Sequence, residues 1–411
     1  MKLGVLIIYF FACLSLLLPP NVVAQEAKIH FGNLKIIPGL AVQGVYDDNI
    51  YLGSGTNSET ELKASDWINH LLPEVNLHYN LRERGNFIFS YEGDLAYYSD
   101  NSSNNWQTHK GIFNLNYLAP VGLSFDLNST YTDAEDPYGS VELYRIGLKT
   151  KRWHNDLKAT IGYDFGNIFK ASIFFNQYTQ NYALERDYTQ DYDENELGLG
   201  FQRRLLPKTW GFFRYQFGDR DYFTHPTGTG VTGSNDSDFD WHMVYFGLTW
   251  DTGAKLNGEL NFGYEWRDYQ NATDVQGNRY DDKDTWVSST QVSFQATSTT
   301  ALALGITKAL RERYSNTNEY FEDTGIGINV QKVIQRKFTL TVGGVYSINE
   351  YNTPSSNPRQ DDNYKFSIGI DHQIQVWLTT GVGYIHEKND SNYGENNYTN
   401  NQLLISLSAW Y

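Results

Sequence analysis

The chain has 411 residues, with 32 basic and 48 acidic side chains and a formal net charge of −16. This acidic balance excludes an extended basic surface for nucleic acid, because phosphate backbones are bound by clustered lysine and arginine. A single cysteine excludes a disulfide within the chain and a thiolate metal cluster. We therefore expect no nucleic-acid partner and no thiolate-bound metal.

Residues 1–24 have the pattern of a secretory signal peptide. Lys2 precedes an apolar stretch over residues 3–18, and small residues lead up to a cleavage site after Ala24. The stretch falls short of the roughly 20 apolar residues that a membrane-spanning helix needs. We expect residues 25–411 to form one exported domain, which would lack Cys13.

The first predicted strand covers about residues 35–46, and similar segments recur along the chain. They include 210–223, 256–269, 301–314, 337–351 and the final segment, about 398–411. In each of them, apolar or aromatic residues alternate with polar ones, which is the period-two pattern of a β-strand with two unlike faces. In 256–269, for example, Leu260, Phe262 and Trp266 lie on one face, opposite Glu259 and Glu265.

The connections between these segments alternate in length. Short ones lie at about 81–86, 118–122, 165–168, 205–209, 251–255, 297–301, 334–337 and 374–377. Longer ones, most of them polar, include 47–66, 133–151, 223–239, 270–284, 352–362 and 388–397. Short turns on one rim and long loops on the other are typical of bacterial outer-membrane barrels. We therefore predict an all-β fold, a transmembrane antiparallel barrel of about 18 strands, with 16 as the alternative.

A barrel in a membrane must close, because hydrocarbon offers no partner for the free edge of a sheet. The first strand is therefore expected to pair with the last. In that last strand Leu403, Ile405, Leu407 and Tyr411 share one face, and we expect this face to contact lipid. We predict location in the bacterial outer membrane, with membrane lipid and lipopolysaccharide as contacts.

The opposite strand faces supply the residues that we expect to line an aqueous lumen. Charged residues of both signs make up this set: Glu92, Asp94, Glu194, Glu196, Arg204, Arg214, Arg220, Glu259, Glu265, Arg267, Arg311 and Arg313. Mixed signs suit a neutral or weakly charged hydrophilic solute. The connection 133–151 is unusually apolar and basic, so it is a candidate constriction that folds into the lumen, with Tyr144, Arg145, Lys149 and Lys151 as its expected contacts; an extended extracellular hairpin is the alternative.

No motif predicts catalytic, cofactor or metal chemistry. Asp191, Asp193 and Asn195 match the first ligand positions of a calcium loop, but Glu196 stands where that loop requires glycine. We interpret these acids as solvated loop residues. The histidines are scattered without ligand spacing, and the chain has no G-x-S-x-G motif. We expect no enzyme, no cofactor and no metal centre, although strands of a barrel can bring Ser, His and Asp together from distant positions.

The first strand, "LKIIPGLAVQGVYDDNIYL" (34–52), resembles the start of the putative β-barrel porin 2 family, with I-x-P followed by an aromatic and D-x-N. The hairpin at 197–222 and the final strand are also similar. The resemblance implies an outer-membrane passage for an extracellular polysaccharide, working with a periplasmic polysaccharide export protein. Alternatives are a general diffusion porin for small hydrophilic solutes and a barrel that displays surface loops.

The predicted facing can be tested by placing charges on the strand 256–269. Phe262→Arg should place a charge against lipid and cost about 2–4 kcal/mol near the bilayer midplane. We expect Asn261→Arg, one residue away, to be tolerated because that position faces water.

Overall fold

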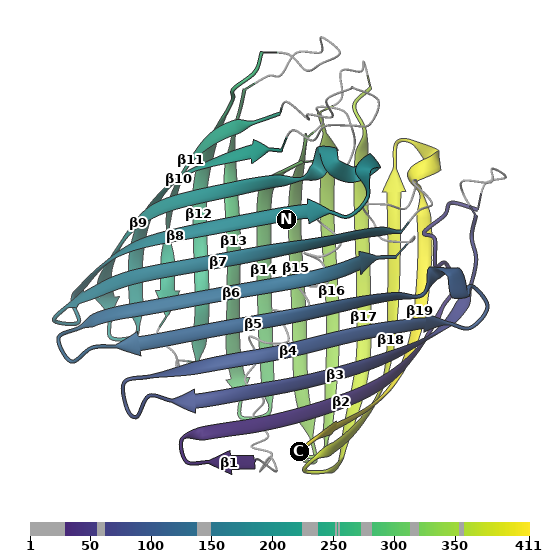
Figure 1. Ribbon diagram of the computed structural model, residues 1–411, viewed down its shortest axis with the longest axis horizontal. Helices are drawn as coiled ribbons and strands as arrows, with labels where there is room; N and C mark the ends of the chain where they lie inside the picture. Colours follow the sequence, from purple (N-terminus) through teal and green to yellow (C-terminus); the bar gives the residue numbers. More distant parts are fainter. Residues whose placement is uncertain are drawn as a thin grey trace.

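The computed structural model describes residues 29–55, 62–137, 149–223, 237–250, 253, 255–272, 282–312, 320–352 and 357–411. Eighteen antiparallel strands, β2 to β19, each pair with their sequence neighbours, and β19 pairs back to β2, so the sheet closes into a barrel. In Figure 1 the strands β2 to β9 in front cross those of the back wall at a steep angle. This tilt is what closure of a sheet into a barrel requires.

The first half of the barrel consists of β2 (Leu34–Asp47), β3 (Asp66–Asn80), β4 (Gly85–Tyr98), β5 (Trp106–Leu118), β6 (Leu123–Asp136), β7 (Thr150–Phe165), β8 (Phe169–Tyr182), β9 (Tyr192–Leu206) and β10 (Thr209–Tyr222). The second half consists of β11 (Phe239–Trp250), β12 (Leu256–Tyr269), β13 (Lys283–Thr297), β14 (Thr300–Glu312), β15 (Tyr320–Ile334), β16 (Phe338–Tyr351), β17 (Gln360–Gln375), β18 (Leu378–Ser391) and β19 (Tyr398–Trp410). A short strand β1 (Ile29–Phe31), which the sequence pattern did not predict, pairs with the start of β2. The 3-10 helices are η1 (Ser102–Asn104), η2 (Glu185–Gln190) and η3 (Gly394–Asn396).

The alternation of short turns and long connections is confirmed. All eight predicted short turns join consecutive strands, from β3–β4 to β17–β18. The connection 133–151 is shorter than predicted, because β6 continues to Asp136 and β7 begins at Thr150. No helix in the described part of the chain is long and apolar enough to cross a membrane.

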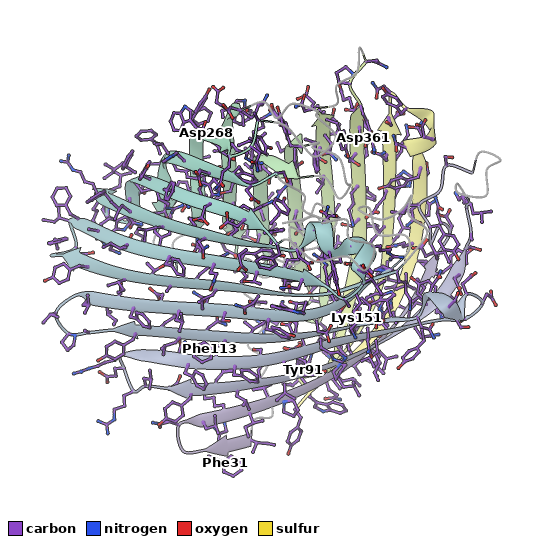
Figure 2. All side chains as sticks on the ribbon, turned by 45° about the horizontal axis from the view of Figure 1, so that its top comes forward. Phe31, Tyr91, Phe113, Lys151, Asp268 and Asp361 are labelled. Carbon is purple, nitrogen blue, oxygen red and sulfur yellow. The ribbon has the colours of Figure 1, made fainter. Side chains whose placement is uncertain are left out.

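The two faces of the barrel wall invert the arrangement of a soluble protein. The final strand illustrates the outer face, where Leu403, Ile405 and Leu407 are 44%, 49% and 48% exposed. On the inner face polar residues are buried, among them Arg152 and Glu265 at 3% each. Figure 2 shows side chains on both sides of the wall, with Phe31 near the rim of short turns and Asp268 and Asp361 near the rim of long connections. This inversion is what lipid outside and polar contents inside require.

The barrel closes through polar side chains where β2 ends beside β19. Asp48 Oδ1 and Oδ2 accept hydrogen bonds of 2.8 Å each from the backbone and side-chain amides of Asn401. Asp47 accepts from Gln402 at 2.7 Å, and the fully buried Asn49 donates to the carbonyl oxygen of Thr399 at 3.0 Å. We call these residues, together with Asn400, the closing cluster. The D-x-N motif of the first strand therefore joins the two ends of the sheet.

Trp410 completes the closure at the opposite rim. Its ring faces inward and lies over Gly39 of β2, where an added Cβ would approach within 2.4 Å of a ring atom. A glycine is required there because any larger residue would displace the indole. Trp410 and Leu404, the two apolar residues on the polar side of the last strand, thus fill the interior rather than contact lipid; Leu404 packs against Val45 and its buried neighbours.

The closing cluster makes stability depend on pH. Asp48 lies in the connection after β2; burial alone would raise the pKa of its carboxyl, but the hydrogen bonds from Asn401 and the nearby Lys63 outweigh burial and lower it. A lowered pKa adds stability above the unfolded-state value of about 3.9, and this stability is lost as pH falls through the folded-state value. Asp48→Asn should lower the free energy of unfolding in detergent by about 1 kcal/mol at pH 7 and have little effect at pH 3. Equal losses at both pH values would contradict this assignment.

The structure supports one part of the predicted facing test on β12 and corrects the other. Phe262 is 58% exposed on the outer face, as predicted, but Asn261 is only 5% exposed. Its amide nitrogen Nδ2 donates to Glu259 Oε1 at 2.8 Å and to Ser289 Oγ at 3.1 Å. The expectation that Asn261→Arg is tolerated is therefore wrong, because arginine would break these buried bonds.

A better pair of neighbouring positions lies in the middle of β17. Ile368 is 41% exposed on the outer face, and the adjacent Ser367 faces the interior. Ile368→Arg should cost about 2–4 kcal/mol, as expected for a charge against hydrocarbon, and Ser367→Arg much less. Unfolding in urea with detergent or lipid vesicles measures both. Similar losses at the two positions would mean that the facing is wrong.

Candidate functional site

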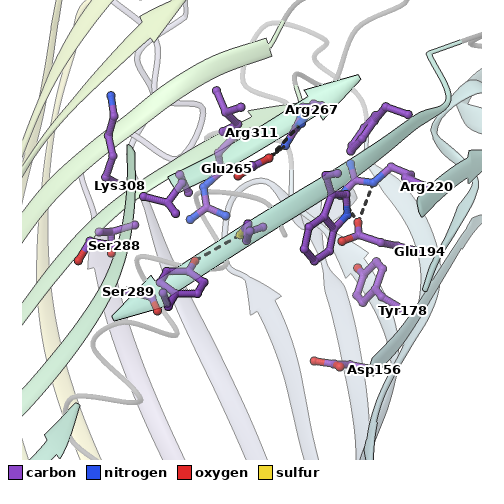
Figure 3. Close-up of a pocket in the computed structure, with 18 of the residues that line it drawn as sticks. Asp156, Tyr178, Glu194, Arg220, Glu265, Arg267, Ser288, Ser289, Lys308 and Arg311 are labelled. Carbon is purple, nitrogen blue, oxygen red and sulfur yellow. Dashed lines mark hydrogen bonds and ion pairs between the residues drawn. The ribbon is translucent and has the colours of Figure 1, made fainter. Parts of the chain in front are cut away.

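The barrel interior contains a cavity of about 520 Å³ on the inner side of β5 to β14. Its size is within the range of about 300–1,000 Å³ that small-molecule sites occupy. Figure 3 shows ten of its lining residues labelled, from Asp156 and Tyr178 on one side to Ser288 and Lys308 on the other. Five residues of the expected lumen set line this cavity: Glu194, Arg220, Glu265, Arg267 and Arg311.

Glu194 of β9 and Arg220 of β10 form an ion pair directly across two strands. They are register partners, and Arg220 Nε donates to Glu194 Oε2 at 2.8 Å. The Arg220 guanidinium also lies 4.2 Å from the centre of the Tyr192 ring and 5.1 Å from that of Phe239. Rings and carboxylate together hold the guanidinium in a fixed position, since an arginine gains from both kinds of contact.

Arg267 and Glu265 form a second pair within β12. Arg267 Nη2 donates to Glu265 Oε1 at 2.9 Å, and the guanidinium lies 4.2 Å from the centre of the Phe239 ring. The Phe239 ring is therefore contacted by two arginines, one from each neighbouring strand. On β14, Arg311 approaches Asp323 of β15 with Nε and Oδ2 3.3 Å apart. Each of these cavity arginines thus has a carboxylate beside it.

A fourth cavity arginine, Arg152 at the start of β7, was missed from the sequence. It makes a two-pronged contact with Asp136 of β6, Nε to Oδ2 at 2.9 Å and Nη2 to Oδ1 at 3.2 Å. Nη1 donates to Gln180 Oε1 at 2.7 Å. The signal was present in the alternation of Arg152, Trp153 and His154, but the predicted connection 133–151 ended just before it.

The other described residues of the expected lumen set lie outside the cavity, also on the inner face. Glu92 accepts from Lys110 at 3.0 Å, Asp94 lies 2.8 Å from His70 Nδ1, and Arg214 donates to Glu259 at 3.0 Å. Glu196 accepts from Gln216. Near the rim of short turns, Arg204 lies 4.5 Å and Lys170 4.3 Å from the ring centre of the buried Trp210. Arg313 lies outside the described residues.

The structure answers only part of the constriction prediction. Tyr144 and Arg145 lie outside the described residues. Lys149 donates to the carbonyl oxygen of Asn105. Lys151 belongs to β7, where it shares the outer face with Trp153 and lies 3.9 Å from Glu135, so its assignment to an inward-folding segment is wrong. The physical reason is that strand pairing extends to Thr150 and fixes which way each side chain points.

The interpretation of Asp191 as a solvated loop acid is also wrong. Its side chain is 1% exposed, and Oδ1 accepts a hydrogen bond of 2.6 Å from the backbone amide of Tyr182. It thus caps the end of β8. Among the described residues, no group of three or more His, Cys, Asp or Glu side chains has the arrangement of a metal site.

Comparison with known protein families places the chain. The sequence profile of the family described as putative beta-barrel porin 2 matches residues 25–411. The chain belongs to this family. It is therefore a porin-like barrel of the bacterial outer membrane. A search of curated proteins found no significant match.

Solved structures of outer-membrane proteins are also similar to this porin-like barrel. The outer membrane protein OpdK from Pseudomonas aeruginosa is 9% identical, with a TM-score of 0.47, over 92% of this chain and 99% of that one. The copper transporter OprC is 12% identical, with a TM-score of 0.45, and the FrpB iron transporter from Neisseria meningitidis is 10% identical, with a TM-score of 0.43. These two matches cover 90% and 86% of this chain but only 63% and 62% of the transporters.

The paired charges of the cavity predict how the porin discriminates ions. Replacing Glu194 and Glu265 together by glutamine would leave Arg220 and Arg267 without their neutralising partners. The reversal potential of the channel in a salt gradient should then shift towards the equilibrium potential of the anion, because positive charge dominates the lumen.

The double variant Asp240→Asn and Asp268→Asn is the matched control. It also removes two negative charges, but from the outer face of β11 and β12, where these two residues are register partners. If the control shifts the reversal potential as much as the glutamine variant does, the ion pairs of the cavity do not set the ion selectivity.

Proposed function

We propose that this barrel is the outer-membrane conduit through which an extracellular polysaccharide is exported. The observation that carries the proposal is the composition of the cavity wall, where paired charges, hydroxyl groups and aromatic rings surround one polar space. The function associated with the family that the first strand resembles points in the same direction. The proposed role is passage of a polymer, with no chemical step.

The paired charges favour a neutral or weakly charged hydrophilic substrate. Arg220 with Glu194 and Arg267 with Glu265 present donors and acceptors a few ångströms apart while cancelling each other's field. A wall of this kind offers hydrogen bonds to sugar hydroxyls at many positions, but it does not hold an ion of either sign tightly. A moving polymer needs such contacts, which are individually weak and can be exchanged.

Aromatic side chains on the same wall suit the apolar faces of sugar rings. Tyr178, Trp241 and Tyr245 line the cavity beside the ion pairs. Trp241 lies over Gly218 of β10, where an added Cβ would come within 2.5 Å of the ring, and it is only 3% exposed, so it supports the wall from within. The rings of Tyr178 and Tyr245 are partly exposed in the same cavity and are therefore placed for stacking.

The partners of this conduit follow from its position. Membrane lipid and lipopolysaccharide would contact its apolar outer face. A periplasmic polysaccharide export protein would deliver the polymer at the rim of short turns. The competing role, a general diffusion porin for small hydrophilic solutes, requires neither.

Two measurements test the proposal. Deletion of the gene should lower polysaccharide at the cell surface and raise it in the periplasm. In planar bilayers, neutral oligosaccharides should interrupt the current of the purified channel, and the interruptions should be shorter with Tyr178→Ala. The matched control is Tyr163→Ala, which removes a tyrosine that is 40% exposed on the outer face. Normal surface polysaccharide after deletion, together with uninterrupted currents, would indicate a diffusion porin.

A further inference from the structure

Backbone pairing in the barrel wall is incomplete at β13. The upper part of this strand, Lys283–Val287, pairs with β12 alone, and the facing part of β14, Ala309–Glu312, pairs with β15 alone. Among the described residues of β13 and β14, pairing begins only at Ser288 with Lys308 and continues from there to the short turn. We call the unpaired region the wall gap. It lies in the half of the wall that leads to the long connections.

The ladder between β12 and β13 is interrupted just below the wall gap. Pairing stops at Gly263 with Val287 and resumes at Glu259 with Gln291. Side chains replace the missing backbone bonds. The backbone amide of Asn261 donates to Thr290 Oγ1 at 2.9 Å, and Ser288 Oγ donates to the backbone carbonyl oxygen of Asn261 at 2.9 Å. Strand β13 thus pairs with β12 above and below this interruption and with β14 only from Ser288 onward, and hydroxyl groups satisfy the backbone at the interruption.

The cavity extends into this part of the wall. Its lining includes Ala309 and Arg311 from the inner face of β14, but also Lys308 and Leu310 from the outer face. Consecutive residues of one strand line the same space through their backbone atoms or where the strand has no neighbour on one side, and among the described residues β14 has no partner on its β13 side from Ala309 onward. Figure 3 shows Lys308 and Ser288 beside each other, on the side of the cavity opposite Tyr178 and Asp156.

Glu322 of β15 contacts side chains from both sides of the wall gap. Its carboxylate accepts from Lys283 of β13, with Nζ and Oε1 2.8 Å apart, from Thr285 Oγ1 at 3.2 Å, and from Lys308 of β14. By strand register, Lys283 and Thr285 are inner-face residues, whereas Lys308 and Glu322 are outer-face residues. They meet because β13 and β14 are apart. We call these four residues the Glu322 cluster.

We propose that the wall gap is a lateral portal between the lumen and the outer leaflet, which admits an amphipathic molecule and is held closed by the Glu322 cluster. The polar part of such a molecule would enter the cavity, and its acyl chains would stay in the membrane. Charges on the lipid side of a barrel wall are costly unless they are paired, so the cluster closes the portal when it is empty. When Glu322 moves away, Lys283 and Lys308 offer two ammonium groups to an anionic headgroup.

Cysteine labelling in lipid vesicles tests the portal. The native cysteine, Cys13, lies in the segment expected to be removed, so a single cysteine can be introduced into residues 25–411. Ala309→Cys places it on the inner face beside the wall gap. Thr130→Cys is the matched control, because Thr130 lines the same cavity but is paired on both sides, to Ile112 and to Asp156.

Each variant is reconstituted in phosphatidylcholine vesicles and treated with either a water-soluble maleimide or a phosphatidylethanolamine that carries maleimide on its headgroup. The water-soluble reagent should label both positions, which also shows that the lumen is intact. The lipid-borne reagent should label Ala309→Cys and leave Thr130→Cys unlabelled. Glu322→Gln, or Lys308→Met as a second route, should speed labelling at Ala309→Cys about fivefold or more, as expected when a charge-assisted contact that holds the closed state is lost.

Heat-modifiable migration of every variant shows whether its barrel has formed. Lipid-borne labelling of both positions, of neither, or at a rate that does not depend on Glu322 and Lys308 would overturn the portal. This result is independent of oligosaccharide block, so the portal and the proposed export function can fail separately.

Discussion

The constraint on which this structure depends is that hydrocarbon cannot hydrogen-bond to a peptide group. Every strand must therefore be paired on both sides, and the sheet must return to its own beginning. The closing cluster fulfils this requirement at one rim, with Asp48 and Asn401 bound through both backbone and side chain. Trp410 fills the space over Gly39 at the other. The same constraint makes the incomplete pairing of β13 exceptional, because hydroxyl groups and an ion cluster stand there in place of the backbone ladder.

Charges inside the barrel follow a consistent rule. The described arginines of the cavity wall each have a carboxylate nearby, on the adjacent strand as with Arg220 and Glu194 or on the same strand as with Arg267 and Glu265. Aromatic rings such as Phe239 separate these pairs and contact the guanidinium groups from the side. The wall is therefore polar without a strong net field, and its side chains keep fixed positions in a wide barrel.

Much of the fold could be predicted because period-two alternation and turn length are local properties. They were sufficient for the eight short turns, the closure of β2 on β19 and the outward face of Phe262. The pairing of Arg152 with Asp136 was missed because Asp136 fell within the predicted connection 133–151 and Arg152 directly after it, so the two were not assigned to paired strands. The burial of Asn261 was missed for a different reason. Alternation indicates that the residue faces inward, but it does not indicate that its side chain is bonded to Glu259 and Ser289 and shielded from water. The wall gap belongs to the same class of features, since whether two adjacent strands pair along their whole length is decided in three dimensions.

The closing cluster also governs the order in which the molecule can form. Asp48 and Asn401 are separated by 353 positions in the sequence, so their hydrogen bonds cannot be made until the last strand is in place. The loop that this contact closes spans almost the whole domain, and its closure entropy is lost in one late step. Any intermediate before that step has two unpaired edges, β2 and the most recently added strand. Such a ribbon needs an external partner for its edges while it enters the membrane, which makes assisted assembly a consequence of the topology itself.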